Sequence, residues 1–129
     1  GTLWENFEIG DNYENGTPNH AWAGGPLIRL DKYYLGIKPT KPGYETYDIN
    51  LSSYLDKRSG TVSTVKGNIM VNVDKEKGTI EINTIDADGT LYLPKSYSSS
   101  PKLPSCQLIE TTDTQYVIKL TKGVNQIHL

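Results

Sequence analysis

From residue 43 onward, apolar and polar residues alternate with a period of two, which is the pattern of half-buried β-strands. The segment 44–51 is a clear example, because the alternation places Tyr47, Ile49 and Leu51 on one face. The other face of the same segment carries charged and polar residues. This part of the chain is therefore expected to bury one face of each strand and to expose the other.

A β-hairpin is predicted where the segments 68–73 and 79–85 flank the polar loop 74–78, which ends in Gly78. Turn residues also separate shorter apolar runs along the rest of the chain. These further strands are predicted at 61–65, 90–93, 107–110 and 116–120, with a last strand after the turn at 122–125. Seven or eight short strands with regular turns indicate a mainly β protein, an antiparallel β-sandwich.

The first 38 residues follow a different pattern. Residues 4–25 are polar, rich in Gly and Asn, and without a clear period, so they are expected to form a loop. Pro26 suits the first position of a helix, and Leu27, Leu30 and Tyr34 recur at helical spacing. The sequence predicts a short helix that begins at Pro26 and ends before Gly36, since glycine commonly follows a helix end.

Composition excludes several classes of protein. Only 36% of the 129 residues are hydrophobic, and no apolar run approaches the roughly 20 residues that cross a membrane, so no membrane partner is expected. The formal net charge of -2 argues against nucleic acid as a partner, because phosphate binding needs a basic surface. The single Cys106 excludes an internal disulfide and is expected to be a small buried hydrophobe. The chain begins with Gly1, as processed chains do, so the lack of a signal peptide leaves targeting open.

The chemistry of the chain is concentrated in its first 22 residues. Trp4 and Glu5 are followed about fifteen residues later by His20 and Trp22, which brings together a carboxylate, an imidazole and both indoles of the protein. A sugar site uses these groups for proton transfer, for recognition of hydroxyls and for stacking on the ring. Two histidines and one cysteine give no metal-ligand spacing, so neither a metal nor a cofactor is expected.

A set of short motifs resembles the C-terminal portion of bacterial α-L-rhamnosidases of glycoside hydrolase family 78. The motifs are Thr2-Leu3-Trp4-Glu5, Asn19-His20-Ala21-Trp22-Ala23-Gly24-Gly25-Pro26, Leu35-Gly36-Ile37-Lys38-Pro39, Pro42-Gly43-Tyr44, Gly60-Thr61-Val62 and Gly67-Asn68-Ile69. Their combination is specific, although no single motif is, and the resemblance covers most of the chain. One departure is Ala23, where serine is frequent in the family.

The resemblance implies a domain organisation. Residues 1–38 would be the last loop and helix of an (α/α)6 catalytic barrel, and residues 39–129 would be the β-sandwich domain that follows it. The upstream barrel would then be a partner within the same chain. The resemblance favours a bacterial protein, periplasmic or extracellular slightly more than cytoplasmic.

The resemblance also implies roles for four residues. Glu5 would be the general base of an inverting hydrolysis of terminal α-L-rhamnosyl residues, and His20 would contact the rhamnose. Trp4 and Trp22 would supply apolar contact to the substrate, a rhamnose-containing glycoside or polysaccharide. The acidic loop that provides the general acid is absent from this sequence, so the 129-residue chain alone is expected to be inactive.

Two other interpretations remain open at this point. The sandwich could be a non-catalytic carbohydrate-binding module, but its only aromatic candidates are the scattered Tyr92, Tyr97 and Tyr116. It could also be a purely structural domain that supports the barrel. On the residues alone, the alternative for Glu5 is an ordinary exposed acid, and the alternative for His20 is a loop histidine bonded to the backbone. Trp4 and Trp22 would then be core or interdomain packing anchors.

Overall fold

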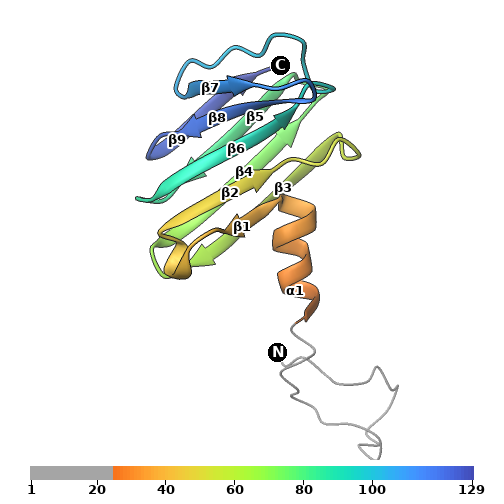
Figure 1. Cartoon of the computed structure of the whole chain (residues 1–129). Helices are drawn as coiled ribbons and strands as arrows, with labels where there is room; N and C mark the ends of the chain where they lie inside the picture. The colour runs from red at the N-terminus through yellow and green to blue at the C-terminus, as the bar shows by residue number, and fades with distance from the viewer. Residues whose placement is uncertain (1–24) are drawn as a thin grey trace, which may run out of the picture. The chain divides into compact units, whose positions relative to one another are not determined.

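The computed structural model describes residues 25–129, and in them nine strands form two sheets that pack face to face (Figure 1). In its strand order, the five-stranded sheet contains β1 (Ile37–Pro39), β2 (Thr46–Asn50), β6 (Asp88–Pro94), β8 (Gln115–Leu120) and β7 (Gln107–Thr111). The four-stranded sheet contains β3 (Lys57–Thr64), β4 (Gly67–Asp74), β5 (Thr79–Thr84) and β9 (Gly123–His128). The mainly β sandwich predicted from the period of two is confirmed.

The hairpin of β4 and β5 follows the sequence pattern closely. The two strands pair antiparallel from Met70 opposite Asn83 to Asp74 opposite Thr79, and the loop closes at Gly78. Burial alternates along both strands, so their branched aliphatic side chains enter the space between the sheets. This is the arrangement that alternation predicts when one face of a sheet is covered and the other is exposed.

One pair of strands differs from the predicted antiparallel arrangement. β2 and β6 run parallel, with Thr46 opposite Asp88 and Asn50 opposite Tyr92. Between them the chain passes through β3, β4 and β5 of the other sheet. The connection is therefore long enough for the two strands to run in the same direction, which a tight hairpin does not allow.

The strand β1 was not predicted. It has only three residues, ends at a proline and pairs with the outer side of β2, where Ile37 lies opposite Ile49. Ile37 is nevertheless 1% exposed and belongs to the core. A strand this short carries no period that sequence analysis could recognise, and Pro39 is tolerated because β1 is at the edge of the sheet.

The predicted helix is present, but its second half has a different geometry. α1 (Gly25–Arg29) is followed by the π-helix η2 (Leu30–Leu35), and the helical segment ends before Gly36, as predicted. A short 3-10 helix, η3 (Pro42–Tyr44), follows β1. None of the helices within residues 25–129 is long and apolar enough to cross a membrane.

One of the polar groups buried in the core is the hydroxyl of Tyr47. This side chain is 1% exposed, and its ring lies against Gly89 of β6, where a Cβ atom would come within 2.5 Å of the ring. Among the described residues the hydroxyl has no hydrogen-bond partner of acceptable geometry. Burial raises the pKa of Tyr47 to about 12, and the nearby Thr84 hydroxyl offsets a small part of this shift.

Candidate functional site

The four residues that the sequence assigns to catalysis and sugar binding lie outside the described residues 25–129. They are Trp4, Glu5, His20 and Trp22. Their roles therefore stay predictions, and so does the domain boundary between residues 38 and 39. What the structure does describe is how the segment that follows them is attached to the sandwich.

This attachment, which we call the joint, is formed by Tyr34–Ile37 and by the residues of β2 and β3 that hold this segment. Gly36 has a φ of +79°, and a Cβ atom there would lie 2.1 Å from the carbonyl oxygen of Asn50. In return, the amide of Asn50 donates a hydrogen bond to the Gly36 carbonyl, at 2.9 Å. Glycine is required at this position because both its conformation and the close approach of the β2 backbone exclude a side chain.

A second contact of the joint involves Leu35 and Gly60. Leu35 is 4% exposed and packs over β3, where a Cβ atom on Gly60 would come within 2.9 Å of the Leu35 side chain. Both glycines belong to the motifs that carry the rhamnosidase resemblance. The structure thus gives those motifs a physical reason: they allow the end of the helical segment to lie directly on the sandwich.

The third element of the joint is Arg58 of β3, which is 3% exposed. Its Nη1 donates to the carbonyl oxygen of Tyr34 at 3.2 Å, and its Nη2 donates to the carbonyl oxygen of Ser52 at 2.5 Å. Nη2 also hydrogen-bonds to the hydroxyl of Tyr97, and that hydroxyl donates to the same Ser52 carbonyl at 2.7 Å. Arg58 thus connects the joint, the loop between β2 and β3, and the loop that follows β6.

Within residues 25–129 the hydrogen-bond partners of Arg58 are neutral oxygens, and its Nε has none. A buried charge that is held only by dipoles is costly, and a guanidinium tolerates this position better than an ammonium because its charge is delocalised and weakly hydrated. The loop side of this network is covered by Lys75, whose Nζ lies 4.2 Å from the centre of the Tyr97 ring. Arg58 therefore serves attachment rather than acid–base chemistry.

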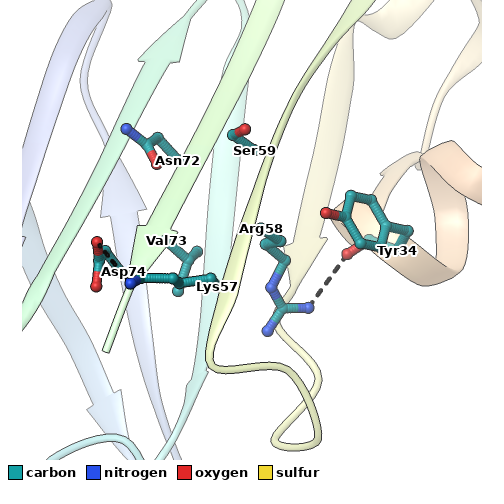
Figure 2. A pocket seen from close by; sticks show the side chains of 7 residues that line it. All are labelled: Tyr34, Lys57, Arg58, Ser59, Asn72, Val73 and Asp74. Carbon is teal, nitrogen blue, oxygen red and sulfur yellow. Dashed lines mark hydrogen bonds and ion pairs between the residues drawn. The ribbon is translucent and has the colours of Figure 1, made fainter. Parts of the chain in front are cut away.

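A shallow pocket of about 280 Å³ opens beside the joint (Figure 2). It is lined by Tyr34, Lys57, Arg58, Ser59, Asn72, Val73 and Asp74. Asp74 is the carboxylate of this pocket, and it forms ion pairs with Lys57 at 3.9 Å and with Lys77 at 3.8 Å. Glycoside hydrolysis needs two carboxyl groups, one as acid and one as base, and this pocket has a single carboxylate that is engaged in ion pairs.

Metal binding and thiol chemistry have little support among the described residues. Among these residues no group of three or more side chains could hold a metal ion. Cys106 is half-buried against the core, and burial raises the pKa of its thiol, which disfavours the reactive thiolate. This agrees with its predicted role as a small hydrophobe, although it is less buried than expected.

The tyrosines that could have formed a sugar-binding platform are mostly inside the protein. Tyr97 is 9% exposed and Tyr116 is 7% exposed, and Tyr116 donates its hydroxyl proton to the carbonyl of Ser99. Tyr92 is half-buried. Stacking on a sugar needs an open ring face, so these side chains give no support to a binding module that uses them.

Sequence analysis missed Arg58, although a signal was present. Arg58, Gly60 and Val62 occupy alternate positions of β3, which places the arginine on the same inward face as the buried Val62. The predicted strand began only at Thr61, whereas β3 begins at Lys57. Extending the period of two backward would have identified a buried charge.

The fold was compared with proteins of known structure. No protein-family model matches the chain, and no curated protein matches it either. The Streptomyces avermitilis α-L-rhamnosidase complexed with L-rhamnose superposes with a TM-score of 0.73 over 99% of this chain, at 15% identity. The α-L-rhamnosidase from Dictyoglumus thermophilum gives a TM-score of 0.67 over 98% of this chain, at 17% identity.

The chain has the fold of a segment of α-L-rhamnosidases. The resemblance predicted from the short motifs is thus confirmed at the level of the fold. The chain spans 14% and 16% of the length of these two enzymes, so most of each enzyme has no counterpart in it.

Proposed function

We propose that the chain is the C-terminal portion of an α-L-rhamnosidase that hydrolyses terminal α-L-rhamnosyl residues with inversion. The observation that carries this proposal is the likeness of the fold to two α-L-rhamnosidases over 98–99% of the chain. The motifs around Glu5 and His20 support it independently, because they bring the chemistry of a sugar site to the segment that precedes the joint.

Glu5 acts in this proposal as the general base. An inverting glycosidase uses one carboxylate to activate water and one carboxylic acid to protonate the leaving oxygen, and the two groups lie about 6.5–9.5 Å apart. Glu5 takes the proton of the attacking water, which adds to the anomeric carbon while the glycosidic bond breaks. The general acid comes from the upstream part of the enzyme, so the 129-residue chain alone does not turn over substrate.

His20, Trp4 and Trp22 bind the sugar in this proposal. An imidazole can donate to or accept from the rhamnose hydroxyls, and the indoles offer an apolar face to the ring. The substrate is accordingly a rhamnose-containing glycoside or polysaccharide.

The sandwich contributes by fixing the end of the segment that carries these residues. Three contacts support this role: Gly36 against Asn50, Leu35 against Gly60, and Arg58 with the Tyr34 carbonyl. Catalytic groups must be held in place to a fraction of an ångström, so a firm attachment of the following segment has direct value for the reaction.

The proposal is tested with the full-length enzyme and an aryl α-L-rhamnoside. We expect Glu5→Gln to lower kcat on the order of a thousandfold with little change in KM, because the amide cannot accept the proton of water. Glu8→Gln is the matched control, since it makes the same change three residues further along, and it is expected to keep kcat. A parent enzyme that is active and unaffected by Glu5→Gln would remove Glu5 from the mechanism, and a parent without any rhamnosidase activity would refute the proposed function.

The inactivity of the isolated chain is tested in the same assay. Turnover by the purified 129-residue chain that disappears in Glu5→Gln would contradict the need for an upstream general acid.

A further inference from the structure

The outer face of the four-stranded sheet presents ordered rows of polar side chains. Strand registers place one residue from each of β3, β4, β5 and β9 in each row. The first row is Lys57, Asp74, Thr79 and His128, and the second is Ser59, Asn72, Glu81 and Gln126. Residues between these positions along each strand point into the core, so the rows belong to the face that is turned away from the other sheet.

Two hollows lie on this face and meet at Asn72. The first is the pocket of about 280 Å³ beside the joint, and the second has a volume of about 190 Å³. The second is lined by Asn72, Thr79, Ile80, Glu81, Gln126, Ile127 and His128. Because Asn72 lines both, the hollows form one strip that crosses all four strands.

The second row offers hydrogen-bonding groups that are not engaged. Among residues 25–129 the side chains of Ser59, Asn72, Glu81 and Gln126 make no hydrogen bond or ion pair with another protein group. They combine a hydroxyl, two amides and a carboxylate. This mixture of donors and acceptors matches the vicinal hydroxyls of a sugar, each of which can donate and accept.

The charges of this face favour a neutral ligand. Lys57 forms ion pairs with both Asp74 and Glu76, so its positive charge is compensated on the spot. Glu81 adds a negatively charged side chain to the second row, which disfavours a phosphate or another anion as the ligand. Tyr34, which is 37% exposed, stands at the side of the first hollow opposite Lys57 and Asp74 and offers an aromatic ring at the end of the strip (Figure 2).

The dimensions of the strip favour a chain of small units. Each hollow is smaller than the roughly 300–1,000 Å³ of a pocket that encloses a drug-sized ligand. We propose that the outer face of the four-stranded sheet is an ancillary site for a neutral oligosaccharide, which lies across β3, β4, β5 and β9 and is hydrogen-bonded by Asn72 at the centre. That this oligosaccharide contains rhamnose rests on the proposed function, whereas the site itself does not.

The test compares two substrates of the full-length enzyme. A soluble α-L-rhamnan has many rhamnosyl units, so other parts of the polymer are available to the strip while one unit is hydrolysed, whereas an aryl α-L-rhamnoside has a single sugar unit. We expect the double variant Asn72→Ala/Gln126→Ala to raise KM for the rhamnan at least about tenfold, since the hydrogen bonds of both side chains to the sugar are lost. Its kinetics on the aryl rhamnoside are expected to stay unchanged.

Asn83→Ala is the matched control, because Asn83 lies on the same face in β5 but lines neither hollow. It is expected to leave both substrates unaffected. An unchanged KM for the rhamnan in the double variant, or an equal rise in KM for both substrates, would overturn the ancillary site.

A titration separates failure of the site from failure of the proposed function. The full-length Glu5→Gln enzyme, which keeps the sugar intact, is titrated calorimetrically with rhamno-oligosaccharides and with cello-oligosaccharides. One outcome is that the wild-type parent hydrolyses neither the rhamnan nor the aryl rhamnoside, while one of the oligosaccharides binds and loses affinity when Asn72 is replaced. This outcome would support the ancillary site and refute the proposed function. If neither oligosaccharide binds in that manner, the site is refuted whatever the parent hydrolyses.

Discussion

Two buried polar side chains occupy the two edge strands of the four-stranded sheet, and they serve different purposes. Asn125 of β9 is 0% exposed, and Arg58 of β3 is 3% exposed. The Asn125 amide is well satisfied: its oxygen accepts from the Thr121 amide at 2.8 Å, and its nitrogen donates to the carbonyls of Thr121 at 2.8 Å and Gly123 at 3.0 Å. Arg58 is charged and leaves its Nε without a partner among the described residues.

The difference is one of range. The shortest hydrogen bonds of Asn125 join it to Thr121 and Gly123, within four residues of it, and a longer one of 3.4 Å reaches the carbonyl of Ile82 in the neighbouring β5. The amide therefore mainly closes the turn between β8 and β9. The hydrogen-bond partners of Arg58 lie 24, 6 and 39 residues away, in three separate segments. The neutral hydrogen-bond network of Asn125 stabilises a turn. The network of the charged Arg58 connects segments that are far apart in the sequence. Burying a charge costs more desolvation free energy than burying a neutral amide, so the joint connects distant segments with the energetically more costly group.

The largest expected contrast is between two glycines with positive φ. Gly36→Ala is expected to lower the free energy of unfolding by about 4 kcal/mol, because a left-handed conformation is combined with a collision against Asn50. Gly123→Ala is the matched control, with a φ of +90° but open space around it, and is expected to cost about 1–2 kcal/mol. Urea unfolding of the 129-residue chain measures both values, and equal losses would show that the close approach at the joint is unimportant.

The next contrast is between Arg58→Met and Asn125→Ala. Each removes a buried hydrogen-bonding group and leaves carbonyls unpaired, so each is expected to cost roughly 2–3 kcal/mol of unfolding free energy. If the proposed function holds, only Arg58→Met lowers kcat of the full-length enzyme on an aryl rhamnoside, by roughly tenfold, because the proposal assigns the positioning of the Glu5 segment to the joint. Assays are made at a temperature where both variants are folded. A similar loss of kcat in both variants would mean that general stability, and not attachment, is what the enzyme requires.

The smallest contrast concerns two buried tyrosines. Tyr97→Phe removes the hydroxyl that links Arg58 to Ser52 and is expected to cost about 1–2 kcal/mol. Tyr47→Phe removes a hydroxyl that has no hydrogen-bond partner of acceptable geometry within residues 25–129, and it is expected to change stability by less than about 0.5 kcal/mol at neutral pH.

The effect of Tyr47→Phe on stability is expected to depend on pH in the alkaline range. The pKa of Tyr47 is about 12 in the folded protein and 10.0 for an ordinary tyrosine, so the folded state keeps a proton that the unfolded state loses. The contribution of Tyr47 to stability is therefore complete below pH 10 and is lost as the pH rises towards 12, by up to about 2–3 kcal/mol. Tyr47→Phe is expected to unfold with a weaker dependence on pH in this range, as measured by urea titrations at several pH values. Parallel curves for wild type and variant would contradict the assigned pKa.

The sequence predicted those parts of the fold that repeat a local pattern. The alternation of 68–73 and 79–85 was sufficient for the hairpin, and Gly36 correctly marked the end of the helical segment. Features that depend on distant parts of the chain were missed: the parallel pairing of β2 with β6, the three-residue β1, and the inward position of Arg58. Each of these features depends on which distant segment lies next to the strand in the folded protein. Local periodicity in the sequence gives no information about that neighbour.

The candidate site was predicted in another way, from the residue types at Trp4, Glu5, His20 and Trp22 and from the resemblance. These residues precede the described part of the chain, and their roles await the Glu5→Gln experiment. The ancillary strip, in contrast, could not be anticipated. Its members are unremarkable polar residues on four strands, and only the registers of the sheet bring Asn72 and Gln126 into one row.

The parallel pairing of β2 with β6 sets an order for folding. The β4–β5 hairpin closes a short loop and can form early. β2 pairs with β6 only after β3, β4 and β5, which lie between them in the sequence, have been placed in the other sheet. β1 and the joint attach to the outer side of β2, so they form after that long loop has closed. The segment that leads towards the proposed catalytic residues is therefore expected to dock last, onto a sandwich that is already assembled.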